Sequence, residues 1–154
     1  MIGLLTVFAG YFGGKEVPEV TCLWVDALRA ESEFMVLCFD SDSPDFWPEQ
    51  WLEDSGMLIL SKRHGEYDFG SYKRGIAAAQ EKKWYQQSSH LLLCNDSVVG
   101  PISPLKPVLG RMQSNEDEAW GLTQSDQITP HLQSYFLLLG RKVFGHHDVQ
   151  AFFR

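Results

Sequence analysis

Residues 2–12 read IGLLTVFAGYF, a nearly continuous apolar run that ends at the pair Gly13-Gly14. Such a run is typical of a strand covered on both faces, as the parallel strands of α/β proteins are. Three further apolar runs follow along the chain: FMVLCF at 34–39, MLIL at 57–60 and HLLLC at 90–94. We therefore predict four parallel strands over these ranges.

Helical patterns lie between the four runs. Pro18 suits the first position of a helix, where a missing N–H costs nothing. The apolar residues after it recur at helical spacing: Val20, Leu23, Trp24, Ala27 and Leu28. A short helix with Trp47 and Trp51 precedes the third strand, and Ser71–Lys83 is predicted as a helix before the fourth. The alternation predicts one α/β domain over residues 1–154, a mostly parallel sheet with helices on both faces.

The last third of the chain is less regular. Ser103 is suited to cap a helix that has Pro104 at its first position and extends to Met112. We expect strands at Ala119–Thr123 and Ser134–Leu139, in a looser part of the sheet where antiparallel pairing is open. The tail from Arg141 predicts one more helix, and the acidic run at 116–118 predicts a solvated loop.

Composition narrows the class of protein. Hydrophobic residues make up 44% of the 154 residues and charged residues 21%, as in a packed globular protein. The net charge is -7, and the basic residues are scattered, whereas binding to nucleic acid requires clustered Lys and Arg. Nucleic acid is therefore excluded as a partner. An acidic protein can still bind a diphosphate when a divalent cation neutralises it.

The cysteines and the N-terminal run bear on location. Cys22, Cys38 and Cys94 are odd in number and lie in apolar stretches, which indicates buried thiols in a reducing compartment. No basic residues precede the run at 2–12, and it is too short to cross a bilayer. We expect a cytoplasmic protein.

Polar residues follow three of the predicted strands. Asp40 and Asp42 follow the second strand, the loop Tyr67-Asp68-Phe69-Gly70 comes after the third, and Asn95-Asp96-Ser97 ends the fourth. Ligands of open α/β sheets bind beyond the carboxyl ends of the strands. A single acidic residue after a strand is usually a turn former. Three clusters on one edge indicate a shared site.

Asp96 has two interpretations. A carboxylate delivered by a buried strand suits Mg²⁺ or Mn²⁺, which would bridge the oxygens of a diphosphate. Alternatively, Asp96 forms an Asx-turn with backbone amides before the bend at Gly100-Pro101. Spacing alone does not decide between them.

Four sequence blocks then indicate a family. They read YDFGSYK at 67–73 with Gly75, HLLLCNDSVVGP at 90–101 with PLK at 104–106, WGLT at 120–123, and HLQSYF at 131–136. In this order they resemble the rhamnan synthesis protein F family over roughly residues 62 to 144. The first sixty residues fit only in pattern.

The resemblance implies a GT-A-like (Rossmann-like) glycosyltransferase fold and transfer of a sugar, typically L-rhamnose, from a dTDP-sugar to a cell-surface glycan. It also implies an Asp-x-Asp-type motif, in which Asp96 is the metal ligand and Asn95 replaces the first carboxylate. The residues expected to bind substrate are Asp40, Asp68, Tyr72, Lys73, Asn95, His131 and Gln133.

Two of these residues have structural alternatives. Asp68 either accepts hydrogen bonds from ribose or sugar hydroxyls, or caps the helix that begins near Ser71. His131 either contacts the diphosphate, metal or acceptor, or is a hydrogen-bonded packing residue. The chain departs from the family at Glu66, where a glycine would let the backbone approach a ligand. His146-His147-Asp148 is expected to be plain surface, because consecutive helical side chains point in different directions.

Family members continue past the equivalent of Arg154, so a fold truncated at its C-terminus is expected and no general base is named. The alternatives are a non-catalytic module that binds a nucleotide-sugar or glycan, and a fragment completed by another chain. The partners that follow are a dTDP-rhamnose-like donor, a glycan acceptor that brings the protein to a membrane surface, and a second copy in a homo-oligomer. Phe152 and Phe153 are expected to be exposed or covered by a partner chain.

Overall fold

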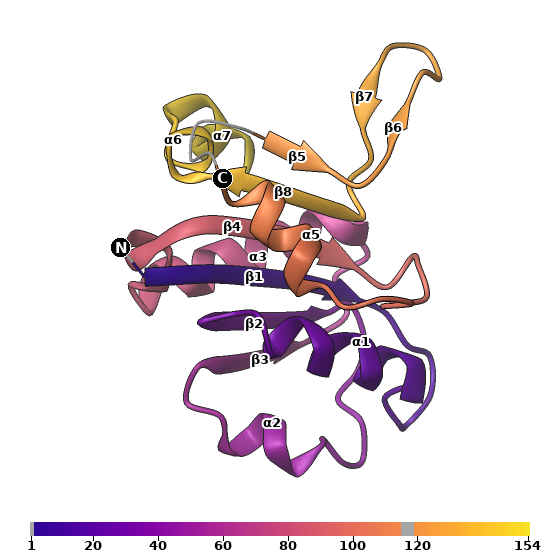
Figure 1. The fold of residues 1–154 in the computed structure, drawn as a ribbon. Helices are drawn as coiled ribbons and strands as arrows, with labels where there is room; N and C mark the ends of the chain where they lie inside the picture. The colour runs from indigo at the N-terminus through magenta and orange to yellow at the C-terminus, as the bar shows by residue number, and fades with distance from the viewer. Residues whose placement is uncertain (1, 115–118) are drawn as a thin grey trace.

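A six-stranded sheet organises the molecule, in a computed structural model that describes residues 2–114 and 119–154 (Figure 1). The strand order is β3-β2-β1-β4-β8-β5. The parallel strands are β1 (Ile2–Gly10), β2 (Phe34–Phe39), β3 (Met57–Ser61) and β4 (Ser88–Asn95). The antiparallel strands are β8 (Phe136–Gly140) and β5 (Ala119–Gly121). The predicted α/β class and mostly parallel sheet are thus confirmed.

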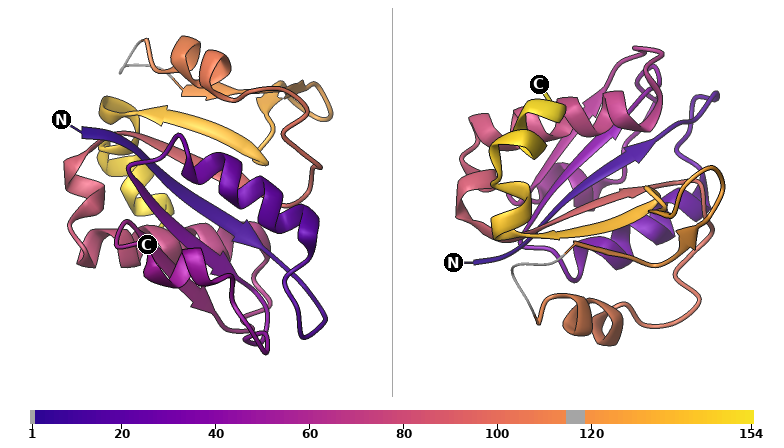
Figure 2. Two further views of the ribbon diagram at one scale, coloured as in Figure 1. Left: turned by 60° about the horizontal axis from the view of Figure 1, so that its bottom comes forward. Right: turned by 90° about the horizontal axis from the view of Figure 1, so that it is seen from above.

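Helices cover both faces of the sheet (Figure 2). One face carries α1 (Glu19–Arg29), α2 (Glu49–Glu53) and α5 (Lys106–Met112). The other carries α3 (Tyr67–Glu81), α4 (Trp84–Gln87), α6 (Arg141–Phe144) and α7 (His147–Phe152). The sheet therefore separates two apolar cores.

The central strand β1 supplies both cores because successive side chains of a strand point to opposite faces. Leu4 and Phe8 pack in the core under α1, whereas Leu5 and Val7 pack in the core under α3. All four are buried. Such two-sided burial explains why this strand reads as an unbroken apolar run.

An ion pair fixes the end of α1 to the segment before β3. The Arg29 guanidinium donates to both carboxylate oxygens of Asp54, with N–O distances of 2.6 and 2.8 Å, and also to the carbonyl of Ser32. The Asp54 carboxylate accepts the Gly56 amide as well. The pair is three-quarters buried, at 26% and 25% exposure, which favours a contribution larger than that of a surface ion pair.

Several boundaries differ from those predicted. Strand β1 ends at Gly10, because the amides of Tyr11 and Phe12 turn to the side chains of Asp96 and Ser41. Helix α3 starts at Tyr67, so the 67–70 segment is its first turn and not a loop. The predicted cap at Ser103 is wrong, since α5 begins at Lys106.

The C-terminal third also differs in detail. β5 ends at Gly121, and β6 (Gln124–Ser125) then pairs with β7 (His131–Leu132) in a separate hairpin. The single helix predicted from Arg141 is two short helices, α6 and α7. The acidic run at 116–118 lies outside the described residues.

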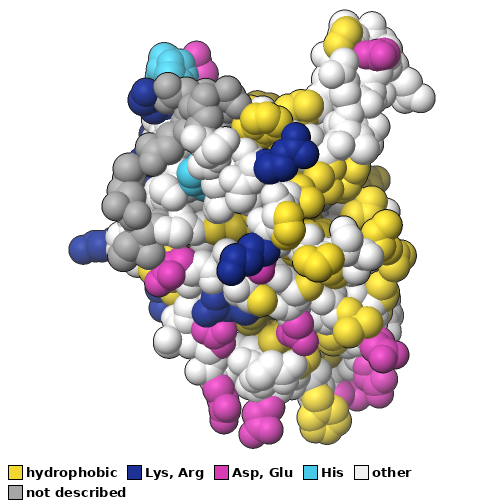
Figure 3. Space-filling model, viewed as in Figure 1, with side chains coloured by type: hydrophobic (Ala, Val, Ile, Leu, Met, Phe, Trp, Pro, Cys, Tyr) yellow, Lys and Arg dark blue, Asp and Glu magenta, His cyan; other side chains and the backbone are white. Residues whose placement is uncertain are grey.

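Apolar side chains remain at the surface in two regions. Ile102 and Val99, in the loop between β4 and α5, are 97% and 78% exposed. Figure 3 shows hydrophobic side chains gathered on the side of the molecule that carries α1 and α5. Phe152 is exposed, as expected, whereas Phe153 is half-buried beside Phe69. No helix among the described residues combines the length and apolar character needed to cross a bilayer.

Candidate functional site

A cleft of about 450 Å³ lies at the carboxyl end of β4. Its wall is formed by the first turn of α3, the end of β4 and the segment around β7. The lining residues are Asp68, Phe69, Asn95, Ser97, His131, Leu132, Gln133, Ser134 and Tyr135. The chain order changes direction across the sheet between β1 and β4, and ligands of open α/β sheets bind at such a switch point.

Asn95 connects Asp68 to the backbone at the end of β4. Its buried side-chain amide donates to the Asp68 carboxylate at 2.6 Å, and its Oδ1 accepts the Ser97 amide at 3.0 Å. The Asn95 backbone carbonyl accepts the indole N–H of Trp24 at 3.2 Å. Asp68 on α3 is thereby fixed to the end of β4, although the two residues lie 27 positions apart.

Asp96 bridges the ends of β4 and β1. Its Oδ2 accepts the Tyr11 amide at 2.7 Å, and its own amide donates to the Ala9 carbonyl at 3.3 Å. The carboxylate is half-buried and adjoins the cleft, but it is not part of the lining. Of Asp40, Asp68 and Asp96, Asp68 is the carboxylate that lines the cleft.

The two carboxyl groups are destabilised in their charged forms. Burial raises the pKa of Asp68, and the hydrogen bond from Asn95 partly offsets that rise. Burial also raises the pKa of Asp96; the Tyr11 amide opposes this, while the negative charge of Asp68 raises it further. Two half-buried carboxylates close enough to repel each other are suited to a cation, which would relieve the repulsion.

The opposite wall is the β6–β7 hairpin and the residues after it. His131 and Gln133 are exposed and line the cleft. The His131 Nδ1 lies 2.8 Å from the Thr129 carbonyl, and the backbone N–H of Gln133 donates to the Thr123 carbonyl at 3.0 Å. The structure thus brings Asp68, Asn95, His131 and Gln133 together, as expected for one site.

The structure does not bring Asp40 into this cleft. Asp40, Asp68 and Asp96 do share the carboxyl edge of the sheet, as predicted. However, the Asp40 carboxylate accepts the amides of His64 and Gly65 at 2.6 and 3.0 Å. The hydrogen bond from the His64 amide lowers the pKa of Asp40. Asp40 therefore holds the loop before α3 in place.

Tyr72 and Lys73 also lie away from the lining. Tyr72 is fully buried, and its hydroxyl donates to the Ser134 carbonyl at 2.9 Å, beneath the cleft. Lys73 is exposed beside Glu66 and Phe153, in a separate groove. Because adjacent helical residues point in different directions, the YDFGSYK block contributes only its first turn to the cleft.

The structural alternatives predicted for Asp96, an Asx-turn, and for Asp68, a helix cap, are not what the structure shows. The Asx-turn at the end of β4 is made by Asn95, whose side chain accepts the Ser97 amide, and not by Asp96. Asp68 lies in the first turn of α3, and the helix has no side-chain cap. Its carboxylate bonds Asn95 across the site instead. Glu66 pairs with Arg74 at 2.9 Å, so its side chain turns away from the cleft.

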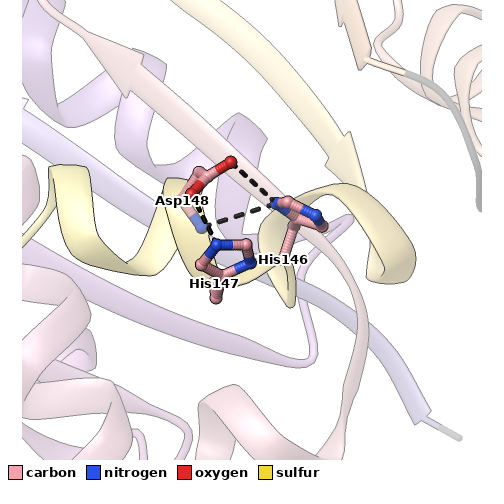
Figure 4. A group of neighbouring side chains, drawn as sticks. All are labelled: His146, His147 and Asp148. Carbon is pink, nitrogen blue, oxygen red and sulfur yellow. Dashed lines mark hydrogen bonds and ion pairs between the residues drawn. The ribbon is translucent and has the colours of Figure 1, made fainter.

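Residues 146–148 are exposed, as predicted, but their side chains converge instead of pointing in different directions. One donor atom of each of His146, His147 and Asp148 lies within 4.8 Å of the others (Figure 4). The side chains converge because His146 precedes α7 and has an extended backbone, so it does not follow the helical rotation. This group lies apart from the residues that line the cleft.

The sequence model of rhamnan synthesis protein F matches residues 50–154 of the chain. The chain belongs to this family. The four sequence blocks that indicated the resemblance all fall in the matched range, and three of them contribute to the cleft lining. Membership of this family links the chain to the synthesis of rhamnan-type polysaccharide.

Two curated proteins are similar to this rhamnan synthesis F chain at low sequence identity. The uncharacterized protein y4gN of Sinorhizobium fredii is 31% identical over 101 residues, covering 63% of the chain and 26% of y4gN. The virulence protein VirA of Vibrio anguillarum is 31% identical over 78 residues, covering 51% of the chain and 24% of VirA. The chain spans about a quarter of the length of these relatives. No solved structure matches.

Sequence reasoning missed several residues of the rhamnan synthesis F cleft. Phe69, Ser97 and Tyr135 line it, yet none of them was expected to bind substrate, although Phe69 and Ser97 belong to the predicted clusters. The signal that could have found them was their position inside the family blocks at 67–73 and 131–136 and directly after Asp96. Phe69 is 46% exposed and presents an aromatic ring at the rim.

Proposed function

We propose that this chain is a GT-A-like domain that binds a dTDP-sugar and transfers its sugar, L-rhamnose, to a cell-surface polysaccharide. The observation that carries the proposal is the pair Asp68 and Asp96 at the switch point between β1 and β4, beside a cleft of about 450 Å³. Family membership supports the polysaccharide context. The donor, the acceptor and the transfer step are what the resemblance to this family implies.

The residues present fit a divalent cation. Mg²⁺ and Mn²⁺ commonly bind through one or two carboxylates and take their other ligands from water and phosphate. Asp96 and Asp68 are two such carboxylates, and each keeps acceptor capacity beyond the one hydrogen bond described for it. A bound cation would supply positive charge for the departing diphosphate. Asp68 thus takes the place of the carboxylate that Asn95 lacks.

The remaining residues bind and orient the donor in this proposal. His131 and Gln133 face the cleft from the hairpin and offer donors to the diphosphate or sugar hydroxyls. Phe69 offers its ring face to an apolar face of the sugar. Asn95 is a positioning residue, because its amide holds Asp68 against the end of β4.

A second candidate function is binding without transfer. It is favoured by Asn95, which carries no charge and whose amide is already engaged by Asp68. In that case the domain would hold a nucleotide-sugar or glycan for another chain or segment. The acceptor, a second copy and a membrane surface reached through the acceptor remain proposed partners. We propose that either activity is cytoplasmic, which three cysteines without a disulfide support.

Calorimetric titration with dTDP-rhamnose, with and without Mn²⁺, tests the proposal. We expect Mn²⁺-dependent binding to the wild type and a loss of affinity of about tenfold or more in Asp96→Asn and Asp68→Asn. The matched control is Asp45→Asn, which removes an exposed carboxylate that does not line the cleft and should leave binding unchanged.

The outcomes separate the candidates. Mn²⁺-dependent binding together with release of dTDP supports a transferase, whereas binding without turnover supports the binding module. Equal affinity in the wild type and both cleft variants would refute the assignment of Asp68 and Asp96. A denaturant melt of each variant shows whether the fold is intact.

A further inference from the structure

We propose that His146, His147 and Asp148 form a surface site for a transition-metal dication of the zinc class. The three side chains converge at the start of α7, with one donor atom of each within 4.8 Å of the others (Figure 4). Nothing in the proposed glycosyltransferase cleft uses them. The inference is therefore independent of the proposed function.

The backbone explains why three consecutive residues converge. His146 is the N-cap of α7, with φ -66° and ψ 141°, and its Nδ1 accepts the Asp148 amide at 3.4 Å. An N-cap side chain in this geometry folds back over the first turn of its helix. The imidazole of His146 therefore lies beside that of His147, with ring centroids 4.6 Å apart, and both rings flank the Asp148 carboxylate.

The distances are close to those of a coordinated set. Zinc bonds of about 2.0–2.2 Å at tetrahedral angles place neighbouring ligand atoms about 3.4 Å apart. The His146 Nδ1 lies 3.6 Å from one Asp148 oxygen, and the His147 Nε2 lies 2.8 Å from the other. All three side chains are more than half exposed, so small rotations suffice to close around an ion. The 3.4 Å capping bond is long and costs little to displace.

The donor set selects the class of metal. Two imidazoles and one carboxylate suit Zn²⁺, Ni²⁺ or Cu²⁺, whereas Mg²⁺ and Ca²⁺ prefer oxygen ligands alone. Water would complete the coordination. The end of α7 itself gives no help, because backbone N–H groups repel a cation; the three side chains carry the site, and the Asp148 charge offsets that repulsion.

Binding would stabilise the start of α7. The backbone around the donors is already held, since the His146 amide donates to Val143 and its carbonyl accepts the Gln150 amide. The far end of α7 carries Phe152, whose ring meets that of Phe69 at 5.8 Å. An ion at the start of α7 therefore stabilises the helix whose end supports the rim of the cleft.

The test is calorimetric titration of the tag-free chain with ZnCl₂ and, separately, with MgCl₂. We expect saturable binding of one Zn²⁺ that depends on these three side chains, and no Mg²⁺ binding that depends on them. His147→Ala and Asp148→Asn should each lower zinc affinity by about tenfold or more. The matched control, His131→Ala, removes an exposed histidine of the cleft and should leave zinc affinity unchanged.

A melting curve gives a second readout, because an ion that binds the native state must raise the melting temperature. Zinc should raise it for the wild type and for His131→Ala, and not for His147→Ala. Unchanged zinc binding in both site variants would show that the ion binds elsewhere on the chain and would overturn the proposal. Loss of binding in His131→Ala alone would place the ion in the cleft and would also overturn it, as would a wild type that shows no saturable zinc binding.

Discussion

Replacing Gly75 by alanine tests how α3 is placed on the sheet. Gly75 lies inside α3 and is buried against the central strand β1. A Cβ atom built at this position would lie 2.3 Å from Cγ1 of Val7. Ordinary carbon–carbon contacts are about 3.5–4.0 Å, so the overlap exceeds about 1 Å. Val7 is fully buried and cannot turn away without moving β1.

The net effect follows from two opposing terms. Overpacking of a tight core costs about 1–3 kcal/mol, and an overlap of this size lies toward the upper end. Alanine gains up to about 1 kcal/mol over glycine inside a helix. We therefore expect Gly75→Ala to lower the free energy of unfolding by about 2 kcal/mol, which corresponds to about 4–8 °C in melting temperature for a chain of this size.

Gly110→Ala is the matched control for urea and thermal melts. Gly110 lies in α5, and a Cβ there would meet nothing within 4 Å. This variant should gain about 0.5–1 kcal/mol. If Gly75→Ala were as stable as Gly110→Ala, the close approach of α3 to β1 would be refuted. Because Asp68 lies in the first turn of the same helix, Gly75→Ala should also weaken donor binding if the proposed site is right.

Two further predictions concern charged groups. Asp54→Asn should lower the free energy of unfolding by about 1–3 kcal/mol near neutral pH. Arg29 lowers the pKa of Asp54 in the folded state, so this difference should vanish as the pH falls through that lowered pKa, measured by urea melts against pH. Asp68 and Asp96 have raised pKa values, so the folded protein binds protons more tightly than the unfolded chain. The wild type should therefore gain stability relative to a double Asn variant as the pH falls from neutral through those raised values. A flat difference between the two would contradict the raised pKa values.

The parallel strands were predictable because burial on both faces leaves a mark on the sequence itself. The range 34–39 was predicted to the residue, since every position from Met35 to Phe39 is buried. The start of α3 was not, because Tyr67 has a positive φ of 55° and the chain enters the helix without a capping side chain. The sequence therefore has no capping residue there that would mark the start of the helix.

The sequence predicted that the site lies at the carboxyl edge of the sheet, but not which side chains contact each other there. The blocks at 67–73, 90–101 and 131–136 gave Asp68, Asn95, His131 and Gln133. The hydrogen bond from Asn95 to Asp68 depends on how α3 packs against β1 and β2, which no spacing reveals. Asp40 stays out of the cleft because its carboxylate accepts the backbone amide of His64, and sequence spacing does not reveal this contact either.

The position of β1 in the middle of the sheet governs the order in which this chain can fold. Its partner on one side, β2, begins 32 residues after the first residue of β1, at Phe34. Its partner on the other side, β4, spans Ser88–Asn95. During synthesis, β1, β2 and β3 can therefore pair while the other edge of β1 stays open. Loop-closure entropy makes the later pairing slow. The apolar N-terminal strand is thus the segment with most to gain from a chaperone until β4 leaves the ribosome.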